Sequence, residues 1–369
     1  GGEWYPFERT LGQRTTQSGG LFIKGNQAVL TRGKLEDLAR LAKESPRMDK
    51  DAALKDLMAQ LEGSGQAVIY GSRKLSVSQL DADAAVPGLE GDGWAAAVSA
   101  TEEKMEVHSV SKSEGEALKE LKKLIPEPLP VPAVPANALA AWQQSTDAKA
   151  IIALFAQTPQ FARALNQLEQ GLKQLGLDLH DDVLKPFGTT FSAWVGVDSK
   201  ATSPFLLLGT AFAGVDIAGG EPQKIVDTVK KVIETTGAPV PGLTGLPNGF
   251  DFKHQMGTLA IRAEKEGNRL SARFGDAPKE TLAATRPAAK RVALNKNQAS
   301  AAWVDFQALA GAAKVGGSLA GQSPLAAIIE KVANALAQYD HLIVTSGQKG
   351  PYQLSHGAMV MTKAAPAGK

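Results

Sequence analysis

Short apolar runs separated by turn residues recur along the chain and predict β-strands. The clearest case is residues 21–31, where two apolar runs flank Gly25-Asn26, a pair that supplies the positive φ of a tight hairpin turn. Runs of the same kind predict further strands at 66–71, 94–98, 105–110, 138–142, 191–197, 205–212, 259–262, 270–274, 299–304, 342–345 and 352–361. Successive strands joined by short turns indicate antiparallel sheet.

Other segments carry apolar residues at the three- and four-residue spacing of an amphipathic helix. This spacing predicts helices at 34–42, 51–61, 114–125, 147–175 with a break at Pro159, 222–235, 279–284 and 325–337. Residues 181–184 predict a short helical turn, and the glycine and proline content of residues 237–249 predicts a loop. The mixture indicates an α+β fold, in which helices pack on one face of an antiparallel β-sheet.

A proline run at residues 126–135 interrupts this pattern. Five of its ten residues are proline, so neither a helix nor a central strand can continue through it. We therefore interpret it as a stiff linker between two related modules, residues 19–125 and 136–363. Residues 1–18 are expected to be a poorly ordered lead-in, and residues 364–369 a tail.

The two expected modules show the same order of elements: hairpin, short helix, strand, helical segment and strand pair. This order covers residues 19–112 and again residues 259–361, which indicates an internal duplication with an offset of about 235–248 residues. The second module has about 125 residues before its hairpin and the first about 20, so a complete first repeat needs roughly 100 residues upstream of Gly1. We expect N-terminal truncation or processing, with unequal repeats as the alternative.

Three segments beyond the proline run carry a family resemblance. Residues 134–142, residues 175–178 with the sequence Leu-Gly-Leu-Asp, and residues 184–188 leading into the apolar run 191–197 follow one another in this order. In this respect the chain resembles the exported bacterial proteins of the DUF3352-like group, over residues 134–363. The resemblance implies repeated α+β modules and a location in the cell envelope. It supplies no catalytic residues.

Charge and composition narrow the classes of function. The 40 Lys and Arg residues are balanced by 38 Asp and Glu, and no segment concentrates one sign, so no nucleic-acid partner is expected. The longest apolar runs, such as residues 205–208, are far shorter than the roughly 20 residues that span a bilayer. Residues 1–4 do not resemble a signal peptide, so peripheral membrane association would require a partner or an anchor upstream of Gly1.

The absence of cysteine excludes disulfides, thiolate metal sites and cysteine nucleophiles. It is also typical of exported bacterial proteins, which avoid mispaired thiols, although many cytoplasmic proteins share it. Together with the resemblance, it favours a periplasmic or extracellular location.

The histidines are the first candidates for site chemistry: His108, His180, His254, His341 and His356. His108 and His356 fall at equivalent places in the last strand of each expected repeat, which is compatible with a shared site or with ordinary packing. Because neither has a second ligand at helical or hairpin spacing, we favour packing. His180-Asp181-Asp182 places three ligand types side by side. Consecutive residues do not converge on one ion, so we interpret it as a polar helix start capped by His180 or Asp181.

Motifs of catalysis and phosphate binding are absent from the sequence. There is no Gly-x-Ser-x-Gly elbow, since Gly63-Ser64-Gly65 leads flexibly into a strand, and no Walker A segment. The glycines at 242, 245 and 249 and those at 88, 91 and 93 do not follow a strand and open a helix. The carboxylate pairs Glu102-Glu103 and Asp81/Asp83 fall in expected solvated turns. No catalytic, cofactor-binding or metal-binding residue is assigned, and the ligand-binding residues are unknown.

Aromatic residues lie in the expected strands, namely Tyr70, Trp94, Trp194 and Trp303. Strand alternation turns them toward a face covered by helices, so a core role is expected for all four. The alternative is an apolar cavity between sheet and helices, with the alanine-rich residues 148–164 and 308–337 leaving room for it.

The sequence favours a non-catalytic exported protein of the cell envelope that acts as a scaffold or accessory subunit of a larger assembly, through a protein partner. The first alternative is a periplasmic carrier that binds a lipid or other apolar ligand between sheet and helices. The second is a hydrolase whose site the sequence does not reveal.

Overall fold

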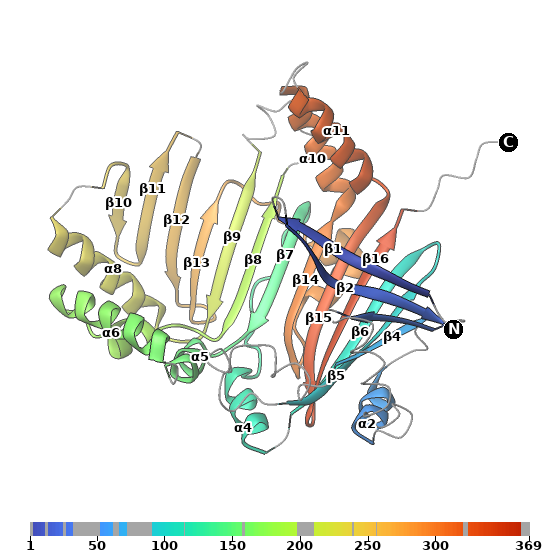
Figure 1. The fold of residues 1–369 in the computed structure, drawn as a ribbon. Helices are drawn as coiled ribbons and strands as arrows, with labels where there is room; N and C mark the ends of the chain where they lie inside the picture. Colours follow the sequence, from blue (N-terminus) through green and yellow to red (C-terminus); the bar gives the residue numbers. More distant parts are fainter. Residues whose placement is uncertain are drawn as a thin grey trace. The chain divides into compact units, whose positions relative to one another are not determined.

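The computed structural model describes residues 3–11, 14–24, 27–31, 52–61, 66–71, 91–113, 115–156, 159–197, 210–237, 240–255, 257–319 and 324–362. It combines helices with a large antiparallel sheet, which confirms the α+β character (Figure 1). The chain divides into two compact units, Gly1–Ala59 and Gln60–Lys369.

The first unit contains a three-stranded antiparallel sheet and all but the last residue of helix α2 (Ala52–Gln60). Its strands are β1 (Glu3–Leu11), β2 (Arg14–Lys24) and β3 (Gln27–Thr31). The β2–β3 pair confirms the hairpin expected at residues 21–31. The structure differs from the expected lead-in at residues 1–18, because β1 pairs with β2 there. Aromatic and β-branched residues such as Trp4, Tyr5 and Thr10 suit a pleated strand, and their strand propensity outweighs the polar and glycine content of this segment.

The second unit is built around one sheet of thirteen strands, and every pairing in it is antiparallel. In chain order the strands are β4 (Ala67–Gly71), β5 (Gly91–Ala100), β6 (Lys104–Ser113), β7 (Ala138–Ser145), β8 (Thr190–Gly196), β9 (Phe212–Ala218), β10 (Leu243–Leu246), β11 (Gly249–His254), β12 (Gly257–Glu264), β13 (Arg269–Phe274), β14 (Gln298–Asp305), β15 (Tyr339–Lys349) and β16 (Tyr352–Met361). Residues 237–249 were expected to be a loop. Instead, β10 lies within this region and β11 begins at its last residue. The expected strand at 205–212 lies mostly outside the described residues, and β9 begins at its last residue.

The helices of this unit connect the strands. They are α4 (Gly115–Leu124), α5 (Ala148–Phe155), α6 (Pro159–Gln174), the π-helix η3 (Leu179–Leu184), α8 (Pro222–Thr236), α9 (Leu282–Thr285), the 3-10 helix η4 (Pro287–Val292), α10 (Phe306–Leu319) and α11 (Pro324–Leu336). Asp147 caps α5 by accepting the amides of Lys149 and Ala150, and Gly237 ends α8 with a φ of 61°. No helix among the described residues is both long and apolar enough to cross a membrane.

The β7–β14 pair lies near the middle of the sheet. On the β7 side follow β8, β9, β13, β12, β11 and β10, and on the β14 side follow β15, β16, β6, β5 and β4. In each direction the central strand is followed in the chain by two α-helices, with η3 in addition after β7, and then by the next two strands of the sheet. The N-terminal strands β4–β6 therefore continue the sheet beyond the C-terminal strand β16, and the two separate modules expected from the sequence are not confirmed.

The proline run, expected as a stiff linker, packs against the sheet. Pro135 forms a β-bridge with Thr281, the amide of Leu129 donates to Thr190 Oγ1 at 2.8 Å, and Pro126 O accepts from Ser145 Oγ at 2.7 Å. Val134 is buried in the main core.

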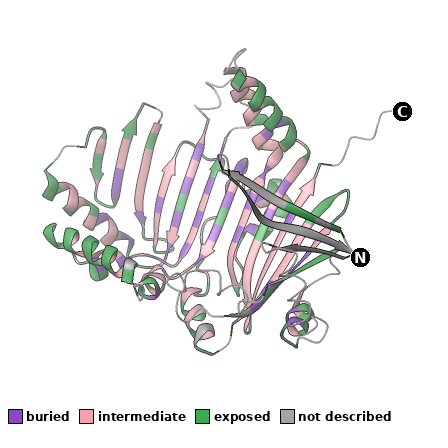
Figure 2. Cartoon of the chain, in the orientation of Figure 1, coloured by how far each residue is buried: buried purple, intermediate pink, exposed green. Residues whose placement is uncertain are grey.

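The main core lies on one side of the central strands, which we call the core face. Its largest members are Trp194, Phe212, Trp303 and Ile343, packed with Val134, Leu282, Ala289 and Val292. The buried positions of Trp194 and Trp303 confirm two of the four aromatic predictions. Figure 2 shows that buried residues concentrate in these central strands, while the helices are largely exposed.

The opposite side of the same strands is called the open face. Toward the β10–β13 edge it is covered by α8, whose Val226 packs against Phe250 and Ala263. Beyond α8 the open face carries a series of exposed apolar side chains. These side chains form the candidate site.

Candidate functional site

Two registered rows of apolar side chains run across strands β14, β7, β8, β9, β13 and β12 on the open face. The cross-strand pairing places these residues in the rows Ala302, Trp142, Ala193, Val215, Ala272 and Val304, Ala140, Val195, Ala213, Phe274, Leu259. Because side chains alternate between the two faces of a strand, all of these residues point to the open face. Alanines therefore separate the larger side chains along both rows.

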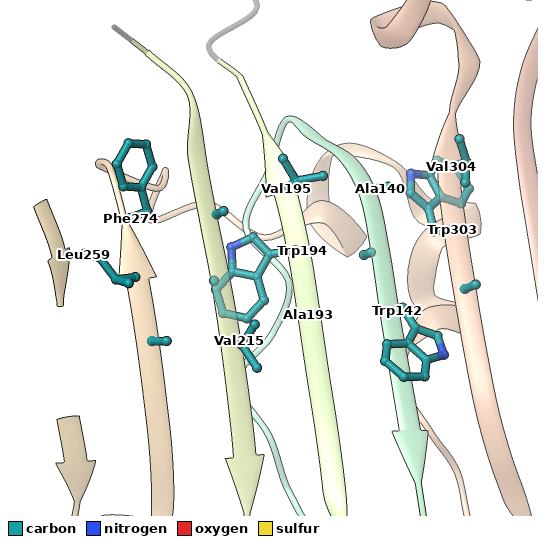
Figure 3. A pocket seen from close by; sticks show the side chains of 15 residues that line it. Ala140, Trp142, Ala193, Trp194, Val195, Val215, Leu259, Phe274, Trp303 and Val304 are labelled. Atoms are coloured by element: carbon teal, nitrogen blue, oxygen red, sulfur yellow. The ribbon is translucent and has the colours of Figure 1, made fainter. Parts of the chain in front are cut away.

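The rows enclose a shallow apolar trough of about 460 Å³ (Figure 3). Its lining consists of Ala, Gly, Val, Leu, Phe and Trp residues, and none of the described residues that line it is charged. Figure 3 shows Trp142 on β7, Val195 on the neighbouring strand β8 and Val215 on β9. The volume is within the ~300–1,000 Å³ of small-molecule sites, but such sites also carry a few convergent polar groups.

The trough is open to solvent. Trp142 is 44% exposed, Val195 46% and Val215 39%, although Trp and Val side chains are normally buried when a partner element is present. Val344 on β15 and Met105 on β6 continue the same face and are also exposed. An apolar surface of this extent marks a binding surface more often than a chance exposure.

Trp94 shows that the aromatic prediction was wrong for one strand. It lies on β5 with 45% of its surface exposed, because its register with Ser111 places it on the open face rather than in the core. The backbone of Tyr70 is in β4, as expected, and its side chain is outside the described residues. The sequence could not distinguish the exposed Trp94 from the buried Trp194 and Trp303, because segments distant in the chain determine which face of the sheet is covered.

A buried charge network lies on the core face of the β9–β13 region. The carboxylate of Asp216 accepts from Arg273 Nη2 at 2.5 Å and lies 3.1 Å from Arg269 Nε. Its side chain is fully buried, and this burial raises the pKa of Asp216, while the two guanidinium groups act in the opposite direction. Arg269 also pairs with Glu264, and the guanidinium of Arg273 stacks 4.6 Å from the ring centroid of Trp194. The network joins three strands and uses its charges internally, which fits a structural role.

His108 and His356 are brought together by the structure. They are direct partners in the β6–β16 pairing, and their rings stack with centroids 4.3 Å apart. Glu106 lies on the same side of β6, with Oε1 3.6 Å from Nε2 of His356. Burial and the neighbouring His108 lower the pKa of His356, and the hydrogen bond from Lys104 lowers the pKa of Glu106.

The sequence links His108 and His356 as equivalent positions, but it does not reveal that they pair directly or that Glu106 joins them, because β6 and β16 are far apart in the chain. The sequence offers one weak signal for this cluster. Residues 106 and 108 are two positions apart on a strand, so their side chains share one face and could bind the same ion.

The remaining histidine and carboxylate candidates do not converge. His341 contacts Asp340 at 2.6 Å and stacks on Trp303, and His254 ends β11. Glu102 and Glu103 are exposed at the turn between β5 and β6, as expected. The residues Asp81, Asp83 and Gly63-Ser64-Gly65 are outside the described residues.

The polar helix start at residues 180–182 is confirmed, but the cap is a different residue. Asp178 caps η3 by accepting the amides of His180 and Asp181, both at 2.8 Å. The hydrogen bond from the Asp181 amide lowers the pKa of Asp178. The cap lies earlier than expected because the extended backbone of Asp178, with ψ 129°, is the geometry that capping requires.

No protein-family model, curated protein or solved structure matches the chain. The resemblance to the DUF3352-like group therefore stays a prediction.

Proposed function

We propose that this chain is a non-catalytic protein of the bacterial cell envelope that binds a protein partner on the open face of its sheet, as a scaffold or accessory subunit. The observation that carries this proposal is the exposed apolar trough around Trp142, Val195 and Val215. The interior of a protein interface is depleted of charge and enriched in aromatic residues, and this lining has the same character.

A protein partner suits the trough better than a small ligand does. Small-molecule sites bury most of their ligand, whereas a chain lying in this shallow trough would stay in contact with water along one side. A protein surface covers both the trough and its continuation at Val344 and Met105. Covering these side chains removes apolar area from water, which is the main favourable term in association.

An apolar-ligand carrier is the second candidate, and one observation favours it. The alanines at 140, 193, 213 and 302 keep the floor of the trough low between Trp142 and Phe274, so a narrow apolar molecule fits between the larger side chains.

Native mass spectrometry of the protein extracted gently from its own source distinguishes the two. We expect a protein-sized partner at fixed stoichiometry. Val195→Arg should remove it, because the substitution places a charge on the open face. Leu168→Arg on α6 is the matched control, since Leu168 is exposed at 53%, compared with 46% for Val195, but lies outside the trough. A small-molecule adduct that vanishes on denaturation would replace the proposal with the carrier, and a bare monomer would contradict both.

A further inference from the structure

The Glu106, His108 and His356 side chains form a compact cluster of metal-binding groups at the β6–β16 pairing. One ligand atom from each residue lies within 4.8 Å of the other two. Glu106 and His108 are two positions apart on β6 and so share a face, while His356 is opposite His108 on β16. Two adjacent strands therefore present three donors to one point.

Two of the donor atoms, Nε2 of His356 and Oε1 of Glu106, are not engaged in a hydrogen bond with each other and can bind an ion. His356 Nε2 is buried and has no hydrogen-bond partner among the described residues, and its 3.6 Å separation from Glu106 Oε1 is too long for a hydrogen bond. A buried nitrogen without a partner is unfavourable, and a metal ion would supply the missing interaction. Lys104 binds the other carboxylate oxygen, Oε2, at 2.9 Å, which leaves Oε1 free to face His356.

We propose that Glu106, His108 and His356 bind one divalent transition-metal ion, and that zinc suits this donor set best. Two imidazoles and a carboxylate are a known zinc ligand set that leaves a fourth position open. In tetrahedral zinc sites with bonds of ~2.0–2.1 Å, neighbouring ligand atoms are ~3.3 Å apart, close to the separation between Glu106 and His356. The two rings must turn slightly out of their stack to converge on the ion.

The two histidines border a polar pocket of about 550 Å³. His108 and His356 line this pocket together with Ser109, Lys296 and Thr345, among others. Calcium and magnesium are disfavoured because they prefer oxygen ligands, and only one of the three donors is an oxygen. This site is independent of the open face, and it departs from the sequence-based expectation that no metal is bound.

The position of the site means that a bound ion would stabilise the sheet. The β6–β16 pairing is the junction between the N-terminal strands β4–β6 and the rest of the sheet. An ion bound by residues of both strands would stabilise this junction, because a ligand that binds only the folded chain shifts unfolding toward higher temperature.

Calorimetric titration of the purified, chelator-treated full chain with zinc chloride tests the proposal. We expect one zinc ion per chain, and the visible absorption of a cobalt(II) form should indicate nitrogen and oxygen ligands in tetrahedral geometry. His356→Ala and Glu106→Gln should each lower zinc affinity at least ~100-fold, since even residues that merely support a ligand cost 10–100-fold. His254→Ala is the control, because His254 is exposed at the end of β11.

Glu106→Gln keeps the size of the side chain and guards against a simple folding defect, which circular dichroism of each variant will reveal. Zinc should also raise the melting temperature of the wild type and of His254→Ala, but not that of Glu106→Gln. No saturable binding to the folded wild type, or equal zinc affinity in Glu106→Gln and His254→Ala, would overturn the proposal.

Discussion

Gly214 lies directly beneath the indole of Trp194, so close that a Cβ at position 214 would be 2.3 Å from the ring. Trp194 is buried in the main core, and the guanidinium of Arg273 packs on its ring. The ring therefore has little freedom to move away. Glycine at this strand position is a packing requirement and not a requirement of backbone conformation.

The first prediction follows from this contact. Gly214→Ala should destabilise the protein by about 1–3 kcal/mol, the usual cost of overpacking a well-packed core. The measurement is the free energy of unfolding in urea. Gly245→Ala is the matched control: Gly245 is also in a strand, but nothing lies within 4 Å of an added Cβ, so its stability should change by less than about 0.5 kcal/mol. Equal stabilities of the two variants would contradict the packing argument.

Arg273→Met should make stability depend on pH through Asp216. Burial raises the pKa of Asp216, and removal of Arg273 raises it further. A carboxyl group whose pKa is raised in the folded state contributes stability below the unfolded pKa and loses it as pH rises through the folded pKa. The variant should therefore be less stable than the wild type by about 2 kcal/mol at pH 7, and the difference should shrink toward about pH 4.

Urea unfolding across this pH range measures the effect. Arg262→Met is the control, because its partner Asp251 is partly exposed and should lose less stability with little dependence on pH. A destabilisation by Arg273→Met that is constant with pH would assign the loss to the contact with Trp194 instead.

Asp147→Ala tests the cap of α5. The Asp147 carboxylate accepts two backbone amides at the first turn, so its removal should cost about 1 kcal/mol. Asp147→Asn keeps an accepting oxygen and should retain most of this stability. Thermal unfolding followed by circular dichroism gives the comparison, and equal losses in both variants would show that charge, not capping, is the source.

In the isolated protein, the exposed apolar side chains of the open face should bind a hydrophobic fluorescent dye. Val195→Lys combined with Val215→Lys should reduce dye fluorescence strongly. Stability should change little, because both side chains are already exposed and lose no core packing. Leu168→Lys should leave the fluorescence unchanged. Undiminished dye binding by the double variant would show that the dye, and by extension a partner, uses another surface.

Local sequence patterns predicted most of the strands, including β6 and β16, whose pairing partners lie far apart in the chain. The hairpin at residues 21–31, the strand at 191–197 and the helix at 222–235 are all present. These elements have regular periodicity and clear turn or cap residues, so the information lies within the element itself.

Two features that distant segments decide were misjudged, the strand β9 and the uncovered side of the central strands. β9 holds Asp216 at its centre, a residue that argues against a strand, and its charge is compensated by Arg269 and Arg273 on β13. The open face was missed for the same reason: alternation shows that Trp142 and Trp94 lie on one side of a strand, but not whether another segment covers that side.

The junction between β6 and β16 has a consequence for how the chain is made. Ser111 and Gln353, which pair there, are 242 residues apart. At ~5–20 residues per second, a ribosome needs ~10–50 s to reach β16 after β6 has been synthesised. During that interval β6 has an unpaired edge, which is a template for aggregation. We expect that chains arrested before residue 352 keep residues 91–113 sensitive to protease, because the sheet is completed only once β16 has been synthesised, and its early strands need protection until then.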